Sequence, residues 1–96
     1  MLKDTIPLML SDDYKARFVA EYMQTKERYE KLHKMIIKLE AGTLTFTPTC
    51  PQHTLEWQAE AMGQYLHVLE VRAEMEGIDL GTEMYNAIKA GLGTED

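Results

Sequence analysis

The feature of this sequence that most restricts its fold is a long run, from Ser11 to Ala41, that contains neither glycine nor proline. Ser11 stands before two aspartates, and a hydroxyl N-cap followed by acidic residues favours the start of a helix. Gly42 follows the run directly and is placed to end the helix. We therefore predict a first helix over about residues 11–41, with roughly 28 residues in helical conformation and a length of about 42 Å.

A connector and a second long helix follow the first helix. Residues 42–53 are rich in threonine and contain two prolines, which interrupt helices, so they predict the connector. The second helix is predicted over about residues 51–76. Its start lies between Pro51, which is acceptable in a first turn, and Thr54, which can act as a cap, and Gly77 ends it.

The C-terminal part of the sequence predicts a turn and a short helix. We expect residues 78–81 to turn and Thr82 to cap a third helix over about residues 82–90. A chain of 96 residues has room for one domain of ordinary size. The sequence therefore predicts a single all-α domain over residues 1–96.

Both long helices carry mainly apolar or aromatic residues at alternating spacings of four and three, which is the pattern of a coiled-coil seam. In the first helix these residues are Phe18, Tyr22, Thr25, Tyr29, Leu32, Ile36 and Leu39. In the second helix they are Leu55, Ala59, Met62, Leu66, Leu69 and Ala73. The two stripes can pack against each other, so we predict a long antiparallel helical hairpin.

Each long helix also carries apolar residues outside its seam, and two interpretations of these residues remain open. They are Val19, Met23, Met35 and Ile37 in the first helix and Trp57, Ala61, Tyr65, Val68 and Met75 in the second. Contiguous apolar surface on so small a protein is typical of a subunit interface, which predicts a compact homo-oligomer. Alternatively, the two ends of the chain fold back and cover these residues, using Ile6, Leu8, Met9 and Leu10 together with Met84, Tyr85, Ile88 and Leu92.

Charge and composition argue against several classes of function. The net charge of −6 disfavours binding to long nucleic acid, and the absence of a long apolar run argues against a membrane span. His33, His53 and His67 fall on three different predicted elements, and Cys50 is the single cysteine, so we expect no metal site and no cofactor. Catalytic groups are equally scarce, because Ser11 is the only serine. We therefore expect a cytoplasmic binding protein and not an enzyme.

The first helix carries a local excess of positive charge beside several aromatic rings. Residues 26–38 contain five cations and two acids. A solvated helix face with supportive pairs such as Glu27 with Lys31 explains this pattern equally well. Tyr14, however, precedes the seam and can project beyond it, whereas Tyr22 and Tyr29 are more simply seam residues. An exposed ring near several cations suits a nucleotide, which combines a base for stacking with phosphates for charge-assisted hydrogen bonds.

Three stretches of the sequence carry a resemblance to a known family. They are Tyr14–Tyr22 (YKARFVAEY), Arg28–Leu32 (RYEKL) and Gln58–Arg72 (QAEAMGQYLHVLEVR). In these stretches the chain resembles a family of small phage proteins that act as anti-CBASS sponges, which sequester the cyclic oligonucleotide messengers of a bacterial immune system. The resemblance covers about residues 14–76, and Thr25 stands where the family tends to have leucine.

The resemblance implies a homo-oligomer, a hexamer in the family, acting in the cytoplasm of the infected bacterial host. It implies binding of cyclic dinucleotides such as 3′,3′-cGAMP between paired protomers, and of cyclic trinucleotides at separate sites, without cleavage. Because the ligand has approximate two-fold symmetry, each protomer can supply the same residues. Tyr14 then stacks on a base, and the candidates for neutralising the phosphates are Arg17, Lys26, Arg28 and Lys31. Arg72 is the candidate for a second nucleotide site.

Two other functions remain open on the sequence. A non-catalytic coiled-coil adaptor or inhibitor would use the remaining apolar stripes to bind a host protein. A small hydrolase of the same messengers is less favoured, because the sequence lacks a recognisable set of catalytic residues.

Overall fold

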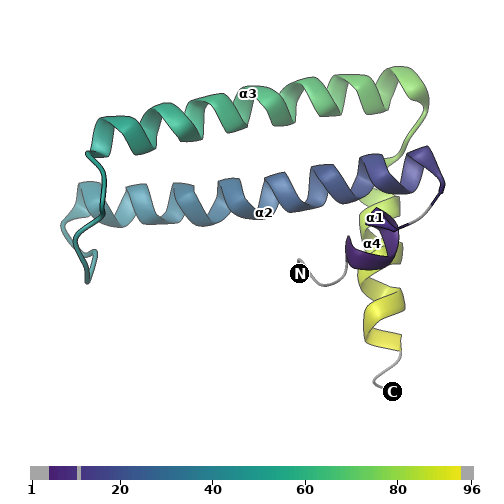
Figure 1. Cartoon of the computed structure of the whole chain (residues 1–96), viewed down its shortest axis with the longest axis horizontal. Helices are drawn as coiled ribbons and strands as arrows, with labels where there is room; N and C mark the ends of the chain where they lie inside the picture. The colour runs from purple at the N-terminus through teal and green to yellow at the C-terminus, as the bar shows by residue number, and fades with distance from the viewer. Residues whose placement is uncertain (1–4, 11, 94–96) are drawn as a thin grey trace.

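The computed structural model describes residues 5–10 and 12–93, and every regular element in them is a helix. The elements are α1 (Ile6–Met9), α2 (Tyr14–Ala41), α3 (Gln52–Glu76) and α4 (Leu80–Gly93). Figure 1 shows α2 and α3 lying side by side with opposite chain directions, while α1 and α4 lie at the end of the pair where α2 begins. The all-α class predicted from the sequence is confirmed.

The ends of α2 follow from two local interactions. Asp13 is the N-cap, because its carboxylate accepts the backbone N–H of Lys15 at 3.0 Å and satisfies a donor of the first turn. The expected start near Ser11 was therefore early, and Ser11 itself lies outside the described residues. At the other end Gly42 has φ 77°, a left-handed conformation that favours glycine, and its N–H donates to the carbonyl of Leu39.

The expected turn and third helix needed correction. α3 begins at Gln52 after Pro51 without a side-chain cap, and it ends before Gly77, which has φ 72°. α4 begins at Leu80, inside the segment expected to turn. The cap is provided by Asp79 and not by Thr82, since the Asp79 carboxylate accepts the Thr82 N–H at 3.1 Å.

The core lies along the contact between α2 and α3, and every residue of the two predicted seams is buried or half-buried. Leu69 and Ala73 of α3 are almost fully buried, as is Phe18 of α2. Burial of such apolar side chains stabilises the pair by about 1.5–3 kcal/mol for each large residue. The spacing of four and three therefore identified the packed faces of both long helices.

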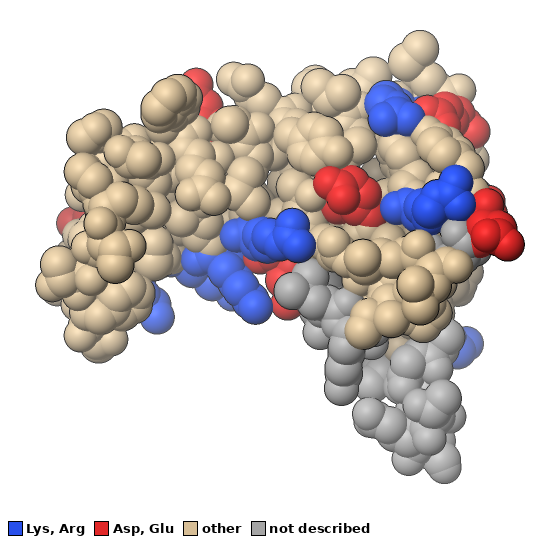
Figure 2. All heavy atoms as spheres, viewed as in Figure 1, with Lys and Arg blue, Asp and Glu red and all other residues tan. Residues whose placement is uncertain are grey.

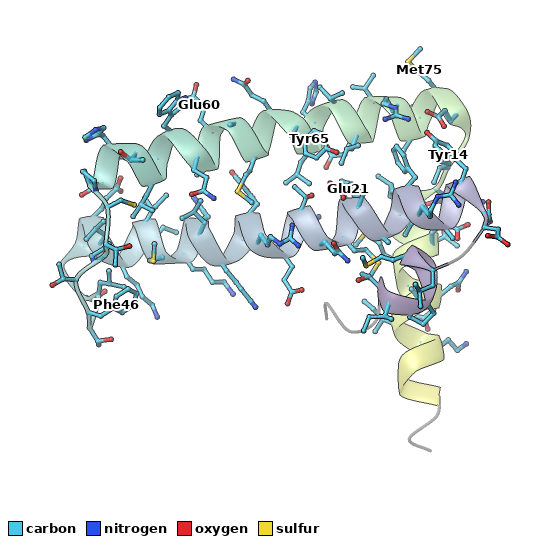
Figure 3. The ribbon with its side chains drawn as sticks, in the orientation of Figure 1. Tyr14, Glu21, Phe46, Glu60, Tyr65 and Met75 are labelled. Atoms are coloured by element: carbon cyan, nitrogen blue, oxygen red, sulfur yellow. The ribbon has the colours of Figure 1, made fainter. Side chains whose placement is uncertain are left out.

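The apolar residues outside the seams have two different fates. Val19 and Met23 are each 2% exposed, because they belong to a core cluster on which Leu80, Met84, Ala87 and Ile88 of α4 pack. The C-terminal helix thus folds back onto α2. In contrast, Trp57 and Met75 on the outer face of α3 are 73% and 81% exposed, and Figure 3 shows Met75 pointing away from the pair.

The short α1 packs on α2 at the same end of the molecule. Thr5 is buried beside it, and its hydroxyl accepts a hydrogen bond from the Gln24 amide at 2.8 Å. Ile6, Met9 and Leu10 nevertheless remain exposed. In the described part of the chain, none of the helices has the length and apolarity that crossing a bilayer requires.

Candidate functional site

An exposed tyrosine and an arginine meet where the first turn of α2 passes the last turns of α3. The Arg72 guanidinium donates a hydrogen bond to the Tyr14 hydroxyl. The same guanidinium carbon lies 5.0 Å from the centroid of the Phe18 ring, a cation–π geometry. The Tyr14 and Phe18 rings are 6.2 Å apart and tilted by 46°. We call Tyr14, Phe18 and Arg72 the tyrosine–arginine cluster.

The local sequence explains this arrangement. Tyr14 lies one helical turn before the seam residue Phe18, so its ring extends the seam to the N-terminal end of α2. There it is 48% exposed. Arg72 precedes the buried Ala73 by one residue, which places its side chain at the rim of the seam. Its Nε atom also lies 3.4 Å from a Glu76 carboxylate oxygen. Arg72 therefore points along the rim and toward Tyr14.

A second polar contact bridges the helices next to the tyrosine–arginine cluster. The Tyr65 hydroxyl donates to the Glu21 carboxylate at 3.2 Å, and the Thr25 hydroxyl donates to the same oxygen at 3.4 Å. Partial burial and, to a lesser extent, the nearby charge of Glu21 raise the pKa of Tyr65. The phenol therefore remains a neutral donor at physiological pH. Figure 3 shows Tyr14, Glu21 and Tyr65 along the gap between α2 and α3. Glu21 places one negative charge on this rim and limits where an anion can lie.

The predicted phosphate-binding cations do not all lie on one side of α2. Arg28 follows Glu21 by seven residues, two helical turns, so both share the flank that carries Tyr14. Lys26 is turned about 200° from Arg28 and lies on the opposite flank, with its Nζ atom 5.6 Å from the centroid of the Tyr22 ring. Within one protomer, Arg28 and Lys26 therefore cannot hold the same phosphate.

The remaining candidate cations differ in their surroundings. Arg17 is exposed and lies one turn after the helix start, close in sequence to Tyr14. Lys31 is 71% exposed and pairs with Glu27 at 3.6 Å, as the interpretation of a solvated helix face expected. Figure 2 shows positive and negative side chains mixed along α2. The upper edge, which α3 forms, is largely uncharged.

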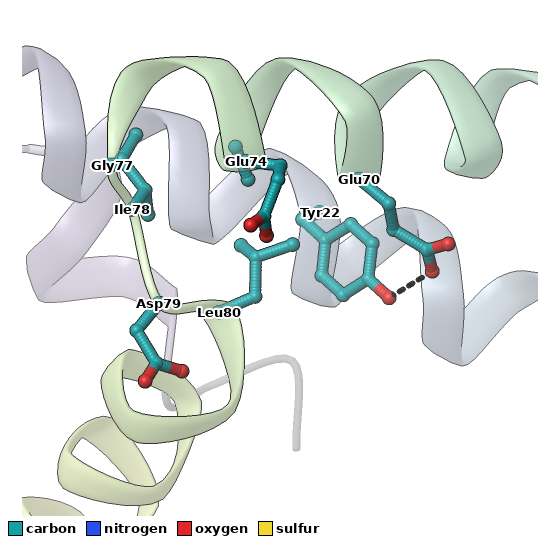
Figure 4. Close-up of a pocket in the computed structure, with 8 residues that line it drawn as sticks. Tyr22, Glu70, Glu74, Gly77, Ile78, Asp79 and Leu80 are labelled. Atoms are coloured by element: carbon teal, nitrogen blue, oxygen red, sulfur yellow. Dashed lines mark hydrogen bonds between the residues drawn. The ribbon is translucent and has the colours of Figure 1, made fainter.

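On the opposite flank the structure has a hollow of about 540 Å³, which we call the acidic hollow. Its lining, most of which Figure 4 labels, consists of Tyr22, Glu70, Ala73, Glu74, Gly77, Ile78, Asp79 and Leu80. The Tyr22 hydroxyl donates to the Glu70 carboxylate at 2.6 Å. Burial, reinforced by that hydrogen bond, raises the pKa of Tyr22. Three carboxylates without a lining lysine or arginine make this hollow unfavourable for phosphate.

A smaller pocket of about 240 Å³ on the same flank contains Lys26. It is lined by Tyr22, Lys26, Tyr29, Glu30, Gly63, Leu66, His67 and Glu70. A Cβ atom at Gly63 would lie 3.4 Å from the Tyr29 ring, so this glycine lets the ring approach α3 closely. Lys26 shares this lining with two glutamates, so the net charge of the pocket is not positive.

Metal-ligating residues do not gather in the part of the chain that the structure describes, where no group of three or more histidine, cysteine or acidic side chains could hold an ion. His33 instead stacks on Tyr29, with ring centroids 6.0 Å apart and planes within 4°.

Sequence reasoning did not anticipate that Phe18, Glu21 and Tyr65 lie on this rim, nor that Arg72, its candidate for a second nucleotide site, contacts Tyr14. One signal was available in the spacing. Tyr14 and Glu21 are seven residues apart, as are Tyr65 and Arg72, so each pair occupies one flank of its helix. Which flank of α3 lies beside which flank of α2 could not be read from that spacing.

Comparison with known proteins places the chain in a family. The model of the family Sequestin matches residues 12–75, more than half of the chain and the part that forms α2, the connector and nearly all of α3. The chain belongs to the Sequestin family. Sequestins are anti-CBASS sponges for cyclic nucleotides, which confirms the resemblance identified in the sequence.

The family assignment describes a binding protein from phage, whose general function is to sequester cyclic nucleotides. No curated protein and no solved structure matched the chain significantly. α4 begins at Leu80, after the last residue that the Sequestin family model matches.

Proposed function

We propose that this sequestin binds cyclic dinucleotides such as 3′,3′-cGAMP, and also cyclic trinucleotides, in the cytoplasm of the infected bacterium. It holds them without cleavage and so withholds them from the effectors of CBASS immunity. The observation that carries this proposal is the contact between Tyr14 and Arg72 on the surface of a chain whose family sequesters cyclic nucleotides.

The chemistry of the tyrosine–arginine cluster matches that of a cyclic nucleotide. The half-exposed Tyr14 ring offers a face for stacking, a contact that contributes about 1–3 kcal/mol per base in proteins that bind single strands. Arg72 offers a planar guanidinium with several N–H donors, which suits bidentate binding of phosphate. In a chain of net charge −6, such a local cation is what makes anion binding favourable. Arg72 therefore acts together with Tyr14 in this proposal.

The other predicted cations take more distant positions around the ligand. Arg17 and Arg28 extend along the flank of α2 that carries Tyr14 and can approach phosphates there. Lys26 and Lys31 face other directions, so they can serve a ligand only at another site or from another copy of the chain. We assign the separate cyclic trinucleotide site to such an arrangement.

A second copy of the chain completes the site. One protomer presents one Tyr14 and one Arg72, whereas a cyclic dinucleotide has two bases and two phosphates. A two-fold assembly supplies both halves of the ligand with identical contacts. We therefore propose a homo-oligomer, with a hexamer as the expected assembly.

The outer face of α3 provides a surface for this assembly. Its residues repeat the spacing of four and three that forms the seam, and they are Trp57, Ala61, Gln64, Val68, Val71 and Met75. Val68 and Val71 are 52% and 45% exposed. This second stripe extends over about 27 Å, at 1.5 Å per residue. Apart from Gln64 this second stripe is apolar, and a second apolar stripe on one helix favours packing against another copy.

The decisive experiment measures free ligand before and after release. We expect purified protein to deplete free 3′,3′-cGAMP and to return it chemically intact after heat denaturation. Recovery of a linear product would instead indicate the hydrolase. An unchanged free pool would contradict the proposal and favour the coiled-coil adaptor that binds a host protein. Light scattering tests the assembly in parallel, because a molar mass of 11.0 kDa, that of a single chain, would contradict it.

A further inference from the structure

The first turn of α2, which carries Tyr14, is held from both sides. Helix ends lack part of their backbone hydrogen bonds and open more easily than helix centres. On one flank, Arg72 of α3 contacts the Tyr14 hydroxyl. On the other flank, the Lys15 Nζ atom lies 2.9 Å from a carboxylate oxygen of Glu83 in α4. Two different helices thus restrain neighbouring residues of this turn.

Glu83 is itself fixed within the first turn of α4. Its backbone N–H donates to the Asp79 carbonyl at 2.9 Å, and the Asp79 side chain caps the same turn. Just before this turn, Ile78 is 8% exposed and its N–H donates to the Ala73 carbonyl at 2.8 Å. The start of α4 is therefore anchored to the end of α3, and Glu83 presents its carboxylate from an ordered position.

The ion pair is well suited to a restraining role. The bond to Glu83 and the attraction of its charge raise the pKa of Lys15, so the ammonium group stays charged at neutral pH. The Lys15 and Glu83 side chains are 45% and 33% exposed, which makes this a surface contact of modest strength. The ion pair links the first turn of α2 to α4, and the start of α4 is itself anchored to the end of α3. It therefore restrains this turn from outside α2.

The ion pair between Lys15 and Glu83 matters most when a ligand is bound. In the proposed complex, a phosphate bound by Arg72 would compete with the Tyr14 hydroxyl for the guanidinium and would weaken the restraint from α3. Lys15 and Glu83 meet on the other flank of α2, so their contact would not face that competition and the restraint from α4 would persist.

We propose that Glu83 is a positioning residue for ligand binding: through Lys15 it holds the first turn of α2, so that Tyr14 is already placed to stack on a base. This inference rests on the proposed function. It gives α4, which lies beyond the residues matched by the Sequestin family model, a role in the site of this chain.

The test exploits the sign of the effect. Removing a carboxylate near an anionic ligand should strengthen binding through simple Coulomb attraction. We expect the opposite for Glu83→Gln, namely a dissociation constant for 3′,3′-cGAMP that is about two- to five-fold higher by calorimetry, the range expected for an exposed ion pair. Glu60→Gln, on α3 and far from the first turn of α2 in Figure 3, makes the same change in net charge and should not weaken binding.

A charge-swapped variant separates positioning from direct contact. Lys15→Glu combined with Glu83→Lys rebuilds the ion pair with reversed polarity, and we expect it to recover most of the lost affinity. If the swap fails to recover affinity, Lys15 itself contacts the ligand and the positioning role is wrong. Equal or tighter binding by Glu83→Gln would also overturn the proposal.

A measurement without ligand tests the restraint independently of the proposed function. Amide hydrogen exchange over residues 14–20 should be faster in Glu83→Gln than in the wild type and should slow again in the charge-swapped variant. Unchanged exchange would overturn the proposed restraint even if the wild type binds cyclic nucleotides. Faster exchange in a protein that gives no binding heat would instead locate the failure in the proposed function.

Discussion

The two flanks of the α2–α3 pair are built from similar parts but differ in charge. Each has a tyrosine of one helix bonded to a glutamate of the other, Tyr65 with Glu21 on one flank and Tyr22 with Glu70 on the opposite flank. The first flank adds the tyrosine–arginine cluster, whereas the second adds further carboxylates and the acidic hollow. For an anionic ligand, the sign of the lining charge matters more than the volume of a cavity.

The distribution of charge along the sequence makes this difference sharper. Residues 41–96 contain nine acids but only two cations, Arg72 and Lys89. Of these two, only Arg72 lies on α3. At the rim of the seam, this one side chain adds the positive charge of α3 to the flank that also carries Tyr14.

The strongest way to break the comparison is to remove that cation. Arg72→Ala should weaken binding of 3′,3′-cGAMP by roughly ten- to a hundred-fold, because hydrogen bonds to charged groups contribute about 1.5–3 kcal/mol. The dissociation constant of Arg72→Lys should lie between those of the wild type and Arg72→Ala, since lysine keeps the charge but lacks the planar guanidinium that binds phosphate through two hydrogen bonds. Calorimetry measures both, and an unchanged dissociation constant for Arg72→Ala would exclude this flank as the binding site.

Loss of the stacking ring should have the next largest effect. Tyr14→Ala should weaken binding by about ten-fold, in line with the contribution of base stacking, while Tyr14→Phe should retain most of the affinity. The molar mass measured by light scattering should stay the same in both variants, because the ring lies outside the packed part of the seam. Loss of assembly in Tyr14→Ala would show that Tyr14 has a structural role instead.

On the opposite flank, a comparable substitution should affect stability and not binding. Tyr22→Phe removes the hydrogen bond to Glu70 and should lower the free energy of unfolding by about 1 kcal/mol, with the ligand dissociation constant unchanged. Urea unfolding monitored by circular dichroism measures the first quantity. A large loss of ligand affinity in Tyr22→Phe would contradict the functional separation of the two flanks.

The pH dependence of Tyr22→Phe sharpens this prediction. The pKa of Tyr22 is raised in the folded state, so folding favours the neutral phenol. Its stabilising contribution is complete below the unfolded value of about 10 and is lost as the pH rises through the higher folded value. Above about pH 10 the wild type should therefore lose stability more steeply than Tyr22→Phe.

The smallest effect is expected in the acidic hollow itself. Glu74→Gln removes one lining carboxylate without touching the tyrosine–arginine cluster, so it should change the dissociation constant by less than about two-fold, and toward tighter binding. A loss of affinity in this variant would indicate that the ligand, or a cation that accompanies it, occupies the hollow.

Much of the helical framework could be predicted because it depends on local chemistry. The glycine-free run marked α2, Gly42 and Gly77 marked helix ends, and the spacing of four and three identified the buried faces. The helix starts were less accurate, since Asp13 and Asp79 act as caps where Ser11 and Thr82 were expected. Several nearby polar residues can cap a helix, and the local sequence does not decide between them.

For the candidate site, the sequence identified Tyr14 as a ring that extends beyond the seam, and it supplied the family resemblance. It did not place Arg72 beside Tyr14, and it left open which of Lys26, Arg28 and Lys31 meets a phosphate. In the structure Lys26 and Arg28 lie on opposite flanks of α2. Periodicity fixes the angles between residues on one helix, but not which residues of a second helix lie opposite them.

The sequence by itself thus determined that the chain is helical and which faces are buried, because both depend on spacing along one chain, and its motifs carried the resemblance to the family that the Sequestin model confirmed. Only the tertiary structure decided that Arg72 meets Tyr14 and that α4 covers Val19 and Met23. Those contacts depend on the register between α2 and α3 and on the direction in which the chain leaves Gly77. Both are set by contacts between residues far apart in the sequence, which must bury apolar side chains and pair charged ones in the same arrangement.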